Sequence, residues 1–215
     1  MEVTLIDKMG TDLSVVNAAR VSFGKKKTKF TKQDEKLINY LATHNHWTPF
    51  GHCSLQFHIV APVFVARQLV KHQVGLVWNE VSRRYVDNEP EFYYPEEWRL
   101  KAEDKKQGSG DEVWEWDERD NLSGPEYAYD NICNDAKSKY MHWVNVLNIC
   151  PEQARMILPQ SMMTEWYWSG TLMAFARVCN LRCKPDAQLE TRIITDKIDI
   201  IGRKEFTVSW KALRN

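Results

Sequence analysis

Apolar and polar positions are arranged as in β-strands in three stretches of this chain. Residues 2–7 (EVTLID) and the segment from Cys53 to Val60 alternate between the two classes. Successive strand residues point to opposite faces, so this pattern predicts strands with one buried face. Met162 to Gly170 (MMTEWYWSG) is instead rich in aromatic residues that favour strands. Taken alone, it favours a core or a subunit interface over a cofactor-binding segment.

Elsewhere the apolar residues recur every three to four positions, which predicts helices. Thr11 or Asp12 could cap the first of these helices. Thr31 and Asp34 have the spacing of a capping box before the second, and Asp186 could cap the last. The expected helices cover residues 13–19, 32–44, 62–74, 126–149, 151–158, 171–180 and 187–202.

The stretch from Ala61 to Tyr85 predicts a helix followed by a strand, both with polar side chains. Pro62 suits the first helical position, because proline has no N–H to lose there, and Gly75 offers a helix end. The helix would carry one polar stripe, made of Arg67, Gln68, Lys71 and His72. From Asn79 onward a strand would place Glu80, Ser82 and Arg84 on one face and Val81, Arg83 and Tyr85 on the other. Such faces predict a pocket for an anionic ligand.

The length of 215 residues is enough for one substantial domain. Neither an internal repeat nor a second domain is apparent. Residues 101–125 (KAEDKKQGSGDEVWEWDERDNLSGP) are highly charged, and we interpret them as an insertion within that domain rather than a linker.

The charge balance argues against binding to nucleic acid or to an anionic membrane by the molecule as a whole. Basic and acidic residues number 29 each, which gives a net charge of zero. The local basic segment GKKKTK (24–29) has no interleaved aromatic residues to stack on bases, so a solvated loop is favoured over a nucleic-acid-binding module. No signal-type or membrane-spanning apolar run occurs, and a cytoplasmic location is expected.

The cysteines and histidines do not have the spacing of a metal site or a disulfide framework. No CxxC pair occurs among the five cysteines, and buried free thiols are favoured over a catalytic role. No two of the histidines lie at helical i, i+4 spacing on a convincing helix, so no metal is expected. His46, beside the turn Thr48 to Gly51, is the histidine expected to face a ligand. The histidines considered are His44, His46, His52 and His58.

Three basic side chains are candidates for binding an anion: Lys71, Arg84 and Arg155. A phosphate is the favoured ligand, because charge-assisted hydrogen bonds are about twice as strong as neutral ones. Ser82 and Gln68 could add neutral hydrogen bonds. The chain has no GxGxxG, GxxxxGK[ST] or GxSxG motif, which excludes the Rossmann, P-loop and serine-hydrolase patterns.

Several ordered motifs resemble those of the flavin-dependent thymidylate synthases. They are HWTPF at 46–50, APVFVARQ at 61–68, KHQ at 71–73 and NEVSRRY at 79–85, with DLSVVNAARVSF upstream and ARMILP, NLR and AQLE downstream. The resemblance implies the α+β fold of the thymidylate synthase-complementing proteins, a mainly antiparallel sheet flanked by helices in a single domain. It also implies a homotetramer with sites shared between subunits.

The activity that the resemblance implies is the reductive methylation of dUMP to dTMP. Methylenetetrahydrofolate would supply the carbon, and NADPH would supply reducing equivalents through bound FAD. The implied dUMP contacts are Gln68, Lys71, Glu80, Val81, Ser82, Arg83, Arg84, Arg155 and Arg182. The implied FAD contacts are His46, Thr48, Lys71, His72, Gln73, Glu80, Thr171 and Arg177.

Arg182 would be the catalytic residue in this interpretation. A guanidinium at the edge of the uracil can stabilise negative charge on the ring while C5 acts as nucleophile, so no enzyme thiol is needed.

The chain departs from the family pattern at several places. The loop between residues 71–73 and Asn79 is one residue longer than usual and lacks a serine often found there. The usual Arg-His-Arg is Lys71-His72-Gln73, the usual Asn-x-Arg is Thr171-Leu172-Met173, and a family Asn falls on Arg177. Lysine and arginine are not equivalent at a bidentate phosphate contact. These departures support an alternative function, a nucleotide-binding homologue of the same fold without catalysis.

Overall fold

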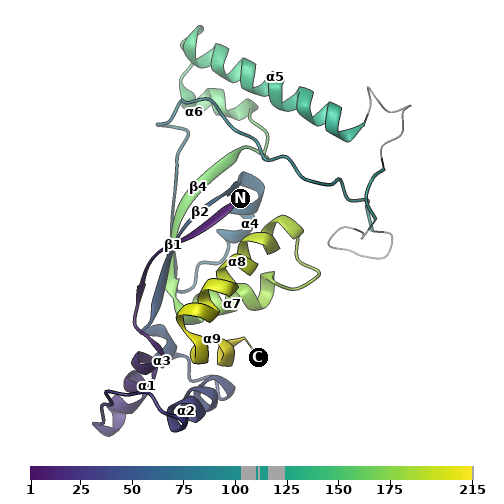
Figure 1. Cartoon of the computed structure of the whole chain (residues 1–215). Coiled ribbons are helices and arrows are strands. Elements are labelled where there is room, and N and C mark those ends of the chain that lie inside the picture. Colours follow the sequence, from purple (N-terminus) through teal and green to yellow (C-terminus); the bar gives the residue numbers. More distant parts are fainter. Residues whose placement is uncertain (103–109, 111, 116–123, 215) are drawn as a thin grey trace. The chain divides into compact units, whose positions relative to one another are not determined.

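The computed structural model describes residues 1–102, 110, 112–115 and 124–214 (Figure 1). The chain divides into two compact units. Unit 1 comprises Met1–Val60, Gln68–Asn79 and Trp166–Asn215. Unit 2 comprises Ala61–Arg67 and Glu80–Glu165. The expectation of a single domain stays a prediction.

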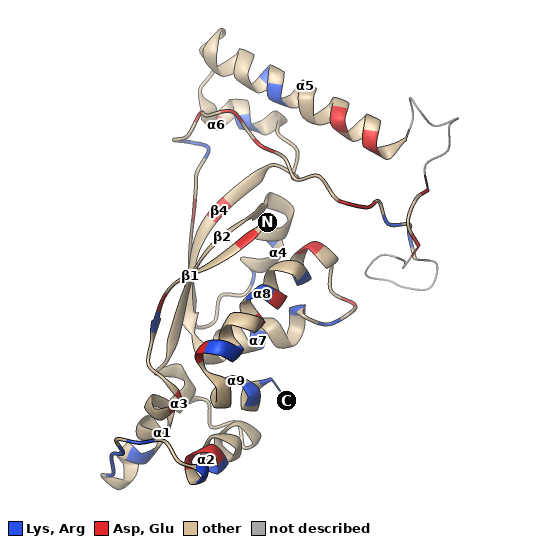
Figure 2. Cartoon of the chain, in the orientation of Figure 1, with Lys and Arg blue, Asp and Glu red and all other residues tan. Residues whose placement is uncertain are grey.

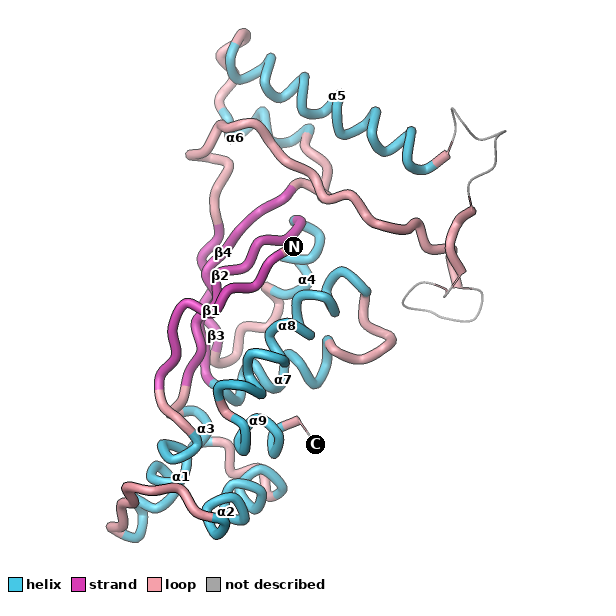
Figure 3. The backbone as a smooth tube through the Cα atoms, viewed as in Figure 1, coloured by secondary structure: helices cyan, strands magenta, loops and turns pink. Residues whose placement is uncertain are grey.

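Four strands form one sheet in the order β1-β2-β4-β3 (Figures 1 and 3). Their bounds are β1 Glu2–Met9, β2 Ser54–Pro62, β3 Leu76–Glu80 and β4 Met163–Thr171. β1 and β2 are antiparallel, with Glu2 opposite Val60 and Met9 opposite Ser54. The expected α+β class with an antiparallel sheet is therefore confirmed. The prediction from the sequence missed the first half of β3.

One face of the sheet is buried, as the alternation along the strands predicts. In β2, Leu55, Phe57 and Ile59 are at most 1 % exposed, and in β4 Trp166 and Trp168 are equally buried. The helices α7 (Leu172–Arg182), α8 (Leu189–Glu205) and α9 (Thr207–Leu213) belong to the same unit, and α7 and α8 lie side by side (Figure 1). Phe175 of α7 packs edge-to-face on the rings of Phe57 and Trp168, which joins this helix to the sheet core.

The N-terminal helices begin where their capping residues predict. Thr11 is the N-cap of α1 (Asp12–Arg20), and Thr31 forms a capping box with Asp34 at the start of α2 (Lys32–Thr43). Asp12 has a different role from the one considered, because its carboxylate accepts hydrogen bonds from the backbone N–H groups of Val208 and Ser209. It therefore satisfies the first turn of α9, a helix that the sequence pattern did not reveal.

The basic segment 24–29 is anchored by contacts with side chains of α1 and α2. It follows the 3₁₀ turn η1 (Val21–Phe23) and appears as a blue stretch of loop beside α1 (Figure 2). The Asn17 side-chain amide donates a hydrogen bond to the Lys27 carbonyl and accepts one from the Lys27 backbone N–H. The Lys27 ammonium lies 2.5 Å from the fully buried Asp34 carboxylate, which also contacts Arg20. The expected loop is thus an ordered one, and one of its lysines is already paired.

The central stretch differs from its prediction at both ends. β2 continues through Pro62, so this proline ends a strand instead of starting the helix α4 (Val63–Leu69). Lys71 and His72 lie in the turn after α4 and not on its polar stripe. The helix ends early because the chain must reverse to enter β3, which pairs with β4. Gly75, with a φ of 77°, completes that reversal.

The expected strand beyond Asn79 is also wrong. β3 ends at Glu80, and Ser82 to Tyr85 form a turn closed by a hydrogen bond from the Tyr85 N–H to the Ser82 carbonyl. The two alternating faces expected for residues 80–85 therefore do not exist. Ser82 and Arg84 are close to each other in this turn, because the Arg84 N–H donates to the Ser82 hydroxyl at 3.3 Å.

Unit 2 contains the long helix α5 (Pro125–Asn145), the single turn α6 (Pro151–Ala154) and the 3₁₀ turn η3 (Arg155–Ile157). The described residues between β3 and α5 run mainly as loop, joined by the isolated bridges Phe92–Met162 and Arg99–Val113 (Figure 3). Most of the segment 101–125, which we interpreted as an insertion, lies outside the described residues.

Three further predictions from the sequence can be compared with the structure. Residues 48–51, expected as a turn, form the one-turn helix α3 (Thr48–Gly51). Gln188, and not Asp186, is the N-cap of α8. All five cysteines are free, and Cys53, Cys133 and Cys179 are buried as expected, whereas Cys150 is exposed and Cys183 is partly exposed. Within the described ranges, no helix has the length and apolar character needed to cross a membrane.

Candidate functional site

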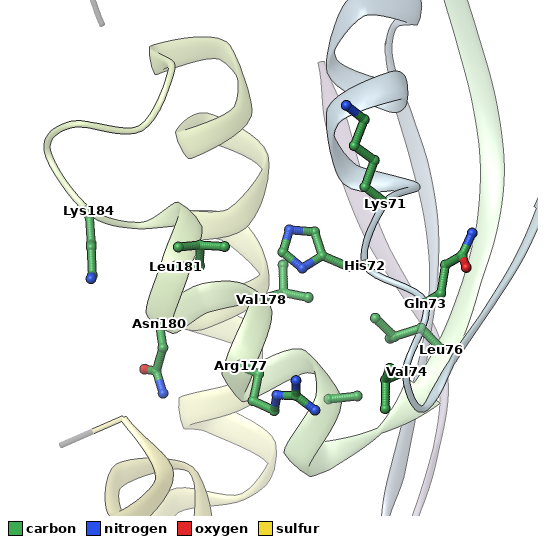
Figure 4. Close-up of a pocket in the computed structure, with 11 residues that line it drawn as sticks. Lys71, His72, Gln73, Val74, Leu76, Arg177, Val178, Asn180, Leu181 and Lys184 are labelled. Atoms are coloured by element: carbon green, nitrogen blue, oxygen red, sulfur yellow. The ribbon is translucent and has the colours of Figure 1, made fainter. Parts of the chain in front are cut away.

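A cavity of about 480 Å³ lies in unit 1 between the turn that follows α4 and the helix α7 (Figure 4). Three adjacent residues of one predicted motif, Lys71, His72 and Gln73, line one side. The other side is lined by residues of α7 and by Lys184, which lies two positions beyond the end of that helix. The full lining is Lys71, His72, Gln73, Val74, Leu76, Ala174, Arg177, Val178, Asn180, Leu181 and Lys184.

The two walls are held close together by the backbone. Gly75 accepts a hydrogen bond at 3.0 Å from the N–H of Thr171, the N-cap of α7. A Cβ on Gly75 would lie 3.1 Å from Ala174 Cβ, tighter than ordinary van der Waals contact. The positive φ and the close approach both favour glycine here, and they fix the distance between the 71–75 turn and α7.

The charge of the cavity is positive. Lys71, Arg177 and Lys184 contribute cations from its two walls, and of the described residues that line it none is acidic. The remaining lining is largely aliphatic: Val74, Leu76, Ala174, Val178 and Leu181. Cations beside an apolar wall suit a ligand that combines phosphate groups with a flat ring system.

His72 connects this cavity to Arg182, the predicted catalytic residue. The Arg182 Nε–H donates to His72 Nε2 at 3.0 Å, across 110 positions of sequence. Burial of the imidazole, together with the guanidinium charges of Arg182 and Arg177, lowers the pKa of His72. The ring is consequently neutral at pH 7, as an acceptor from arginine must be.

Gln68, another predicted substrate contact, is held by the start of α8. Its Nε2 donates to Gln188 Oε1 at 3.1 Å. Its own Oε1 is buried with no hydrogen-bond partner among the described residues. A buried amide oxygen without a donor costs stability.

A second group of predicted residues lies in unit 2, and we call Ser82, Arg84, Glu152 and Arg155 the Arg84 cluster. Arg84 Nε lies 3.3 Å from a Glu152 carboxylate oxygen, and both side chains are about half exposed. Arg155 Nε donates to the Glu152 backbone carbonyl at 3.2 Å. Glu152 therefore brings together two of the three cations predicted to bind an anion.

The neighbours of this cluster have contacts within unit 2. Glu80 accepts a hydrogen bond at 2.8 Å from Thr164, and the Val81 N–H donates to the Glu165 carbonyl. The Arg83 guanidinium lies over the ring of the buried Tyr140 and donates to the Asn88 carbonyl. Arg83 thus already has two contacts within unit 2.

Four predicted FAD contacts lie outside the cavity lining: His46, Thr48, Glu80 and Thr171. His46 stacks on Tyr40 together with His44, and Thr48 is the first residue of α3. The Thr171 hydroxyl accepts from the Ala174 N–H, which makes it a helix cap. No group of three His, Cys, Asp or Glu side chains in the described part of the chain could hold a metal ion.

Sequence reasoning missed several lining residues. Asn180, Leu181 and Lys184 were not predicted, yet with Arg177 they have the i, i+3, i+4, i+7 spacing of one helix face. That spacing, counted from Arg177, was the available signal. Gln188 and Glu152 carried no such signal, because their partners lie far away in the sequence.

The family model for thymidylate synthase complementing protein matches residues 4–206 of this chain. The chain belongs to this family. Its curated relatives include the flavin-dependent thymidylate synthase of Rickettsia bellii, 37% identical over 218 residues, covering 93% of this chain and 71% of the relative. The flavin-dependent thymidylate synthase of Thermus thermophilus is 36% identical over 212 residues, covering 98% and 74%.

A solved structure of the same fold is the UMP/dUMP methylase PolB from Streptomyces cacaoi, bound with 5-bromo-UMP. It superposes with a TM-score of 0.82 at 28% identity, over 98% of this chain and 92% of PolB. The family resemblance inferred from the motifs is confirmed. In this member of the thymidylate synthase complementing protein family, residues 71–73 line the positive cavity.

Proposed function

We propose that this protein is a flavin-dependent thymidylate synthase that converts dUMP to dTMP. The observation that carries the proposal is the positive cavity, because it gathers Lys71, His72, Gln73 and Arg177 and is linked through His72 to Arg182. These are five of the residues that the family resemblance assigns to substrate or flavin. They come from two segments more than 100 positions apart.

We propose FAD as the cofactor of the cavity. The donor set fits it: Lys71, Arg177 and Lys184 can bind the diphosphate, and the aliphatic wall can cover a ring. When bound, FAD would supply the hydride that completes the methyl group. The cavity residues bind and orient it, and the absence of carboxylates from their lining avoids repulsion of its phosphates.

For dUMP, we propose that the Arg84 cluster binds the phosphate. Ser82 supplies a hydroxyl, and Arg84 and Arg155 supply charge-assisted donors. Both arginines are exposed, so an anion can reach them. Gln68 is the proposed contact of the pyrimidine from the α4 side, as the family resemblance implies.

Arg182 would act on the pyrimidine itself. Its guanidinium can stabilise negative charge on a ring nitrogen or oxygen. That charge increases the nucleophilicity of C5, which attacks the one-carbon unit. Three of the five thiols are buried, and burial raises the pKa of Cys53 to about 11, so this thiol stays protonated.

The overall reaction that we propose uses methylenetetrahydrofolate as carbon donor and NADPH as reductant, in the cytoplasm. We further propose a homotetramer in which each site takes Gln68 to Gln73 from one subunit and Glu80 to Arg84 from another.

The test is a spectrum followed by an activity assay. Purified protein should show a flavin absorption band, and dUMP with methylenetetrahydrofolate should accelerate oxidation of the bound flavin. Arg182→Ala should abolish release of tritium from C5-labelled dUMP while flavin binding persists. Flavin and dUMP binding without any turnover would support the non-catalytic homologue instead, and protein that takes up no FAD would refute the proposal.

A further inference from the structure

The contact between His72 and Arg182 requires one particular state of the imidazole. Nε2 accepts the proton of Arg182 Nε at 3.0 Å, so this nitrogen carries a lone pair and any proton on a neutral ring sits on Nδ1. A protonated ring would offer only donors to a guanidinium that has no acceptor. The hydrogen bond therefore exists only while His72 is neutral.

The surroundings of His72 maintain that neutral state. The guanidinium groups of Arg182 and Arg177, both in α7, act on the ring electrostatically. Lys71 precedes His72 in the same turn, and Lys184 lies two positions beyond the end of α7, but both lysines point away from the ring (Figure 4). A proton on the imidazole would add a further positive charge beside the two guanidinium groups. The half-buried ring is also poorly placed to recover that cost from water.

Arg182 in turn depends on this contact for its orientation. It is the last residue of α7, where helix ends fray, and its long side chain has many rotamers. The bond to His72 uses the Nε–H and leaves the N–H groups of both Nη atoms for another acceptor. An arginine held by Nε presents its Nη edge in a defined direction.

We propose that neutral His72 is the positioning residue of Arg182, and that it aims the Nη edge of this guanidinium at the pyrimidine of the substrate. The inference rests on the proposed function. It assigns His72 a role toward the nucleotide in addition to any contact with the flavin. Protonation of His72 removes the acceptor, releases Arg182 and thereby lowers the rate at acidic pH.

Two substitutions of His72 separate positioning from mere packing. In His72→Gln, the glutamine Oε1 can accept the hydrogen bond in place of the imidazole Nε2, but it does not titrate. His72→Ala removes the acceptor altogether. In tritium release at saturating FAD and dUMP, His72→Ala should lower kcat about 100-fold, the loss typical of a misplaced catalytic group. His72→Gln should recover most of that loss, and its kcat should lack the acidic decline shown by the native enzyme.

His142→Gln is the matched control, since His142 is an exposed histidine of α5 outside both the cavity and the Arg84 cluster. It should keep the native pH profile. FAD affinity, measured by quenching of flavin fluorescence, and thermal stability are recorded for every variant. A normal kcat in His72→Ala at saturating FAD, or equal losses in the Ala and Gln variants, overturns the positioning role. Arg182→Ala is assayed in parallel, and its normal turnover would show that Arg182 is not the catalytic residue, whereas native protein that neither binds FAD nor releases tritium would refute the proposed function itself.

Discussion

Replacing Asp34 by Asn should destabilise the protein far more than a typical surface charge change. The carboxylate is fully buried at the third position of α2. Its Oδ2 accepts from Lys27 Nζ at 2.5 Å, Thr31 N at 2.9 Å and Thr31 Oγ1 at 2.7 Å. Its Oδ1 accepts from Arg20 at 3.0 Å. An asparagine has one acceptor oxygen, so one of these two sets of donors loses its acceptor.

The magnitude follows from burial and from the exposure of the partners. Removing one member of a buried ion pair costs about 3–5 kcal/mol. The Arg20 and Lys27 side chains are 26% and 27% exposed, so they recover part of their hydration and the cost falls to about 2–3 kcal/mol. With a urea m-value of about 2 kcal/mol/M, the unfolding midpoint should fall by about 1–1.5 M.

The pH dependence gives a second check. Burial alone would raise the pKa of Asp34, but hydrogen bonds from Lys27, Thr31 and Arg20 outweigh it and hold that pKa well below its usual range. A lowered folded-state pKa stabilises the protein above the unfolded-state pKa of about 3.9, and this contribution is lost as the pH falls. The difference between native protein and Asp34→Asn should therefore be about 1 kcal/mol smaller at pH 3 than at pH 7.

The assay is urea unfolding followed by tryptophan fluorescence at one fixed protein concentration, because subunit association would make stability concentration-dependent. Asp135→Asn is the control. Asp135 pairs with Lys139 at 2.6 Å, but both side chains are about 60% exposed, so the cost should stay below about 0.5 kcal/mol. If Asp34→Asn shifts the midpoint no more than Asp135→Asn, the reasoning about burial is wrong.

Three further substitutions test the proposed dUMP contacts and the packing of β4. Ser82→Ala should weaken dUMP binding by about 1 kcal/mol through loss of one phosphate hydrogen bond, and an unchanged dissociation constant in calorimetry would contradict that role. Glu152→Gln removes the carboxylate beside Arg84 and should tighten dUMP binding by a factor of about 1.5–5 at low salt, an effect that high salt should erase. Gly170→Ala should lower the melting temperature and the soluble yield, because its Cβ would lie 2.5 Å from the backbone oxygen of Gly75; native-like melting would show that the strand can shift.

Local signals predicted much of this fold. The Thr31–Asp34 capping box set the start of α2, because both partners lie within one turn of each other. The alternation in β2 identified its buried face correctly, since strand side chains alternate whatever their partner strand is. The motifs at 46–50, 61–68, 71–73 and 79–85 were sufficient for the family, which the comparison with known proteins confirmed.

The candidate site was predicted as a set of residues but not as an arrangement. The sequence alone identified Lys71, His72, Gln73, Arg177 and Arg182, because the family pattern places them. It also placed Lys71 and His72 on a helix that in fact ends at Leu69. Helical periodicity does not reveal where a chain must turn to pair with a distant strand.

Tertiary structure alone decided how these residues act together. The cavity exists because β3 and β4 pair and bring the turn at Gly75 against the start of α7, a contact between segments nearly 100 positions apart. The same pairing places His72 within hydrogen-bond distance of Arg182, and burial together with the charges of Arg182 and Arg177 lowers the pKa of His72. Sequence patterns report which side of one element is buried, whereas the protonation state and aim of a side chain depend on neighbours that only the folded chain supplies.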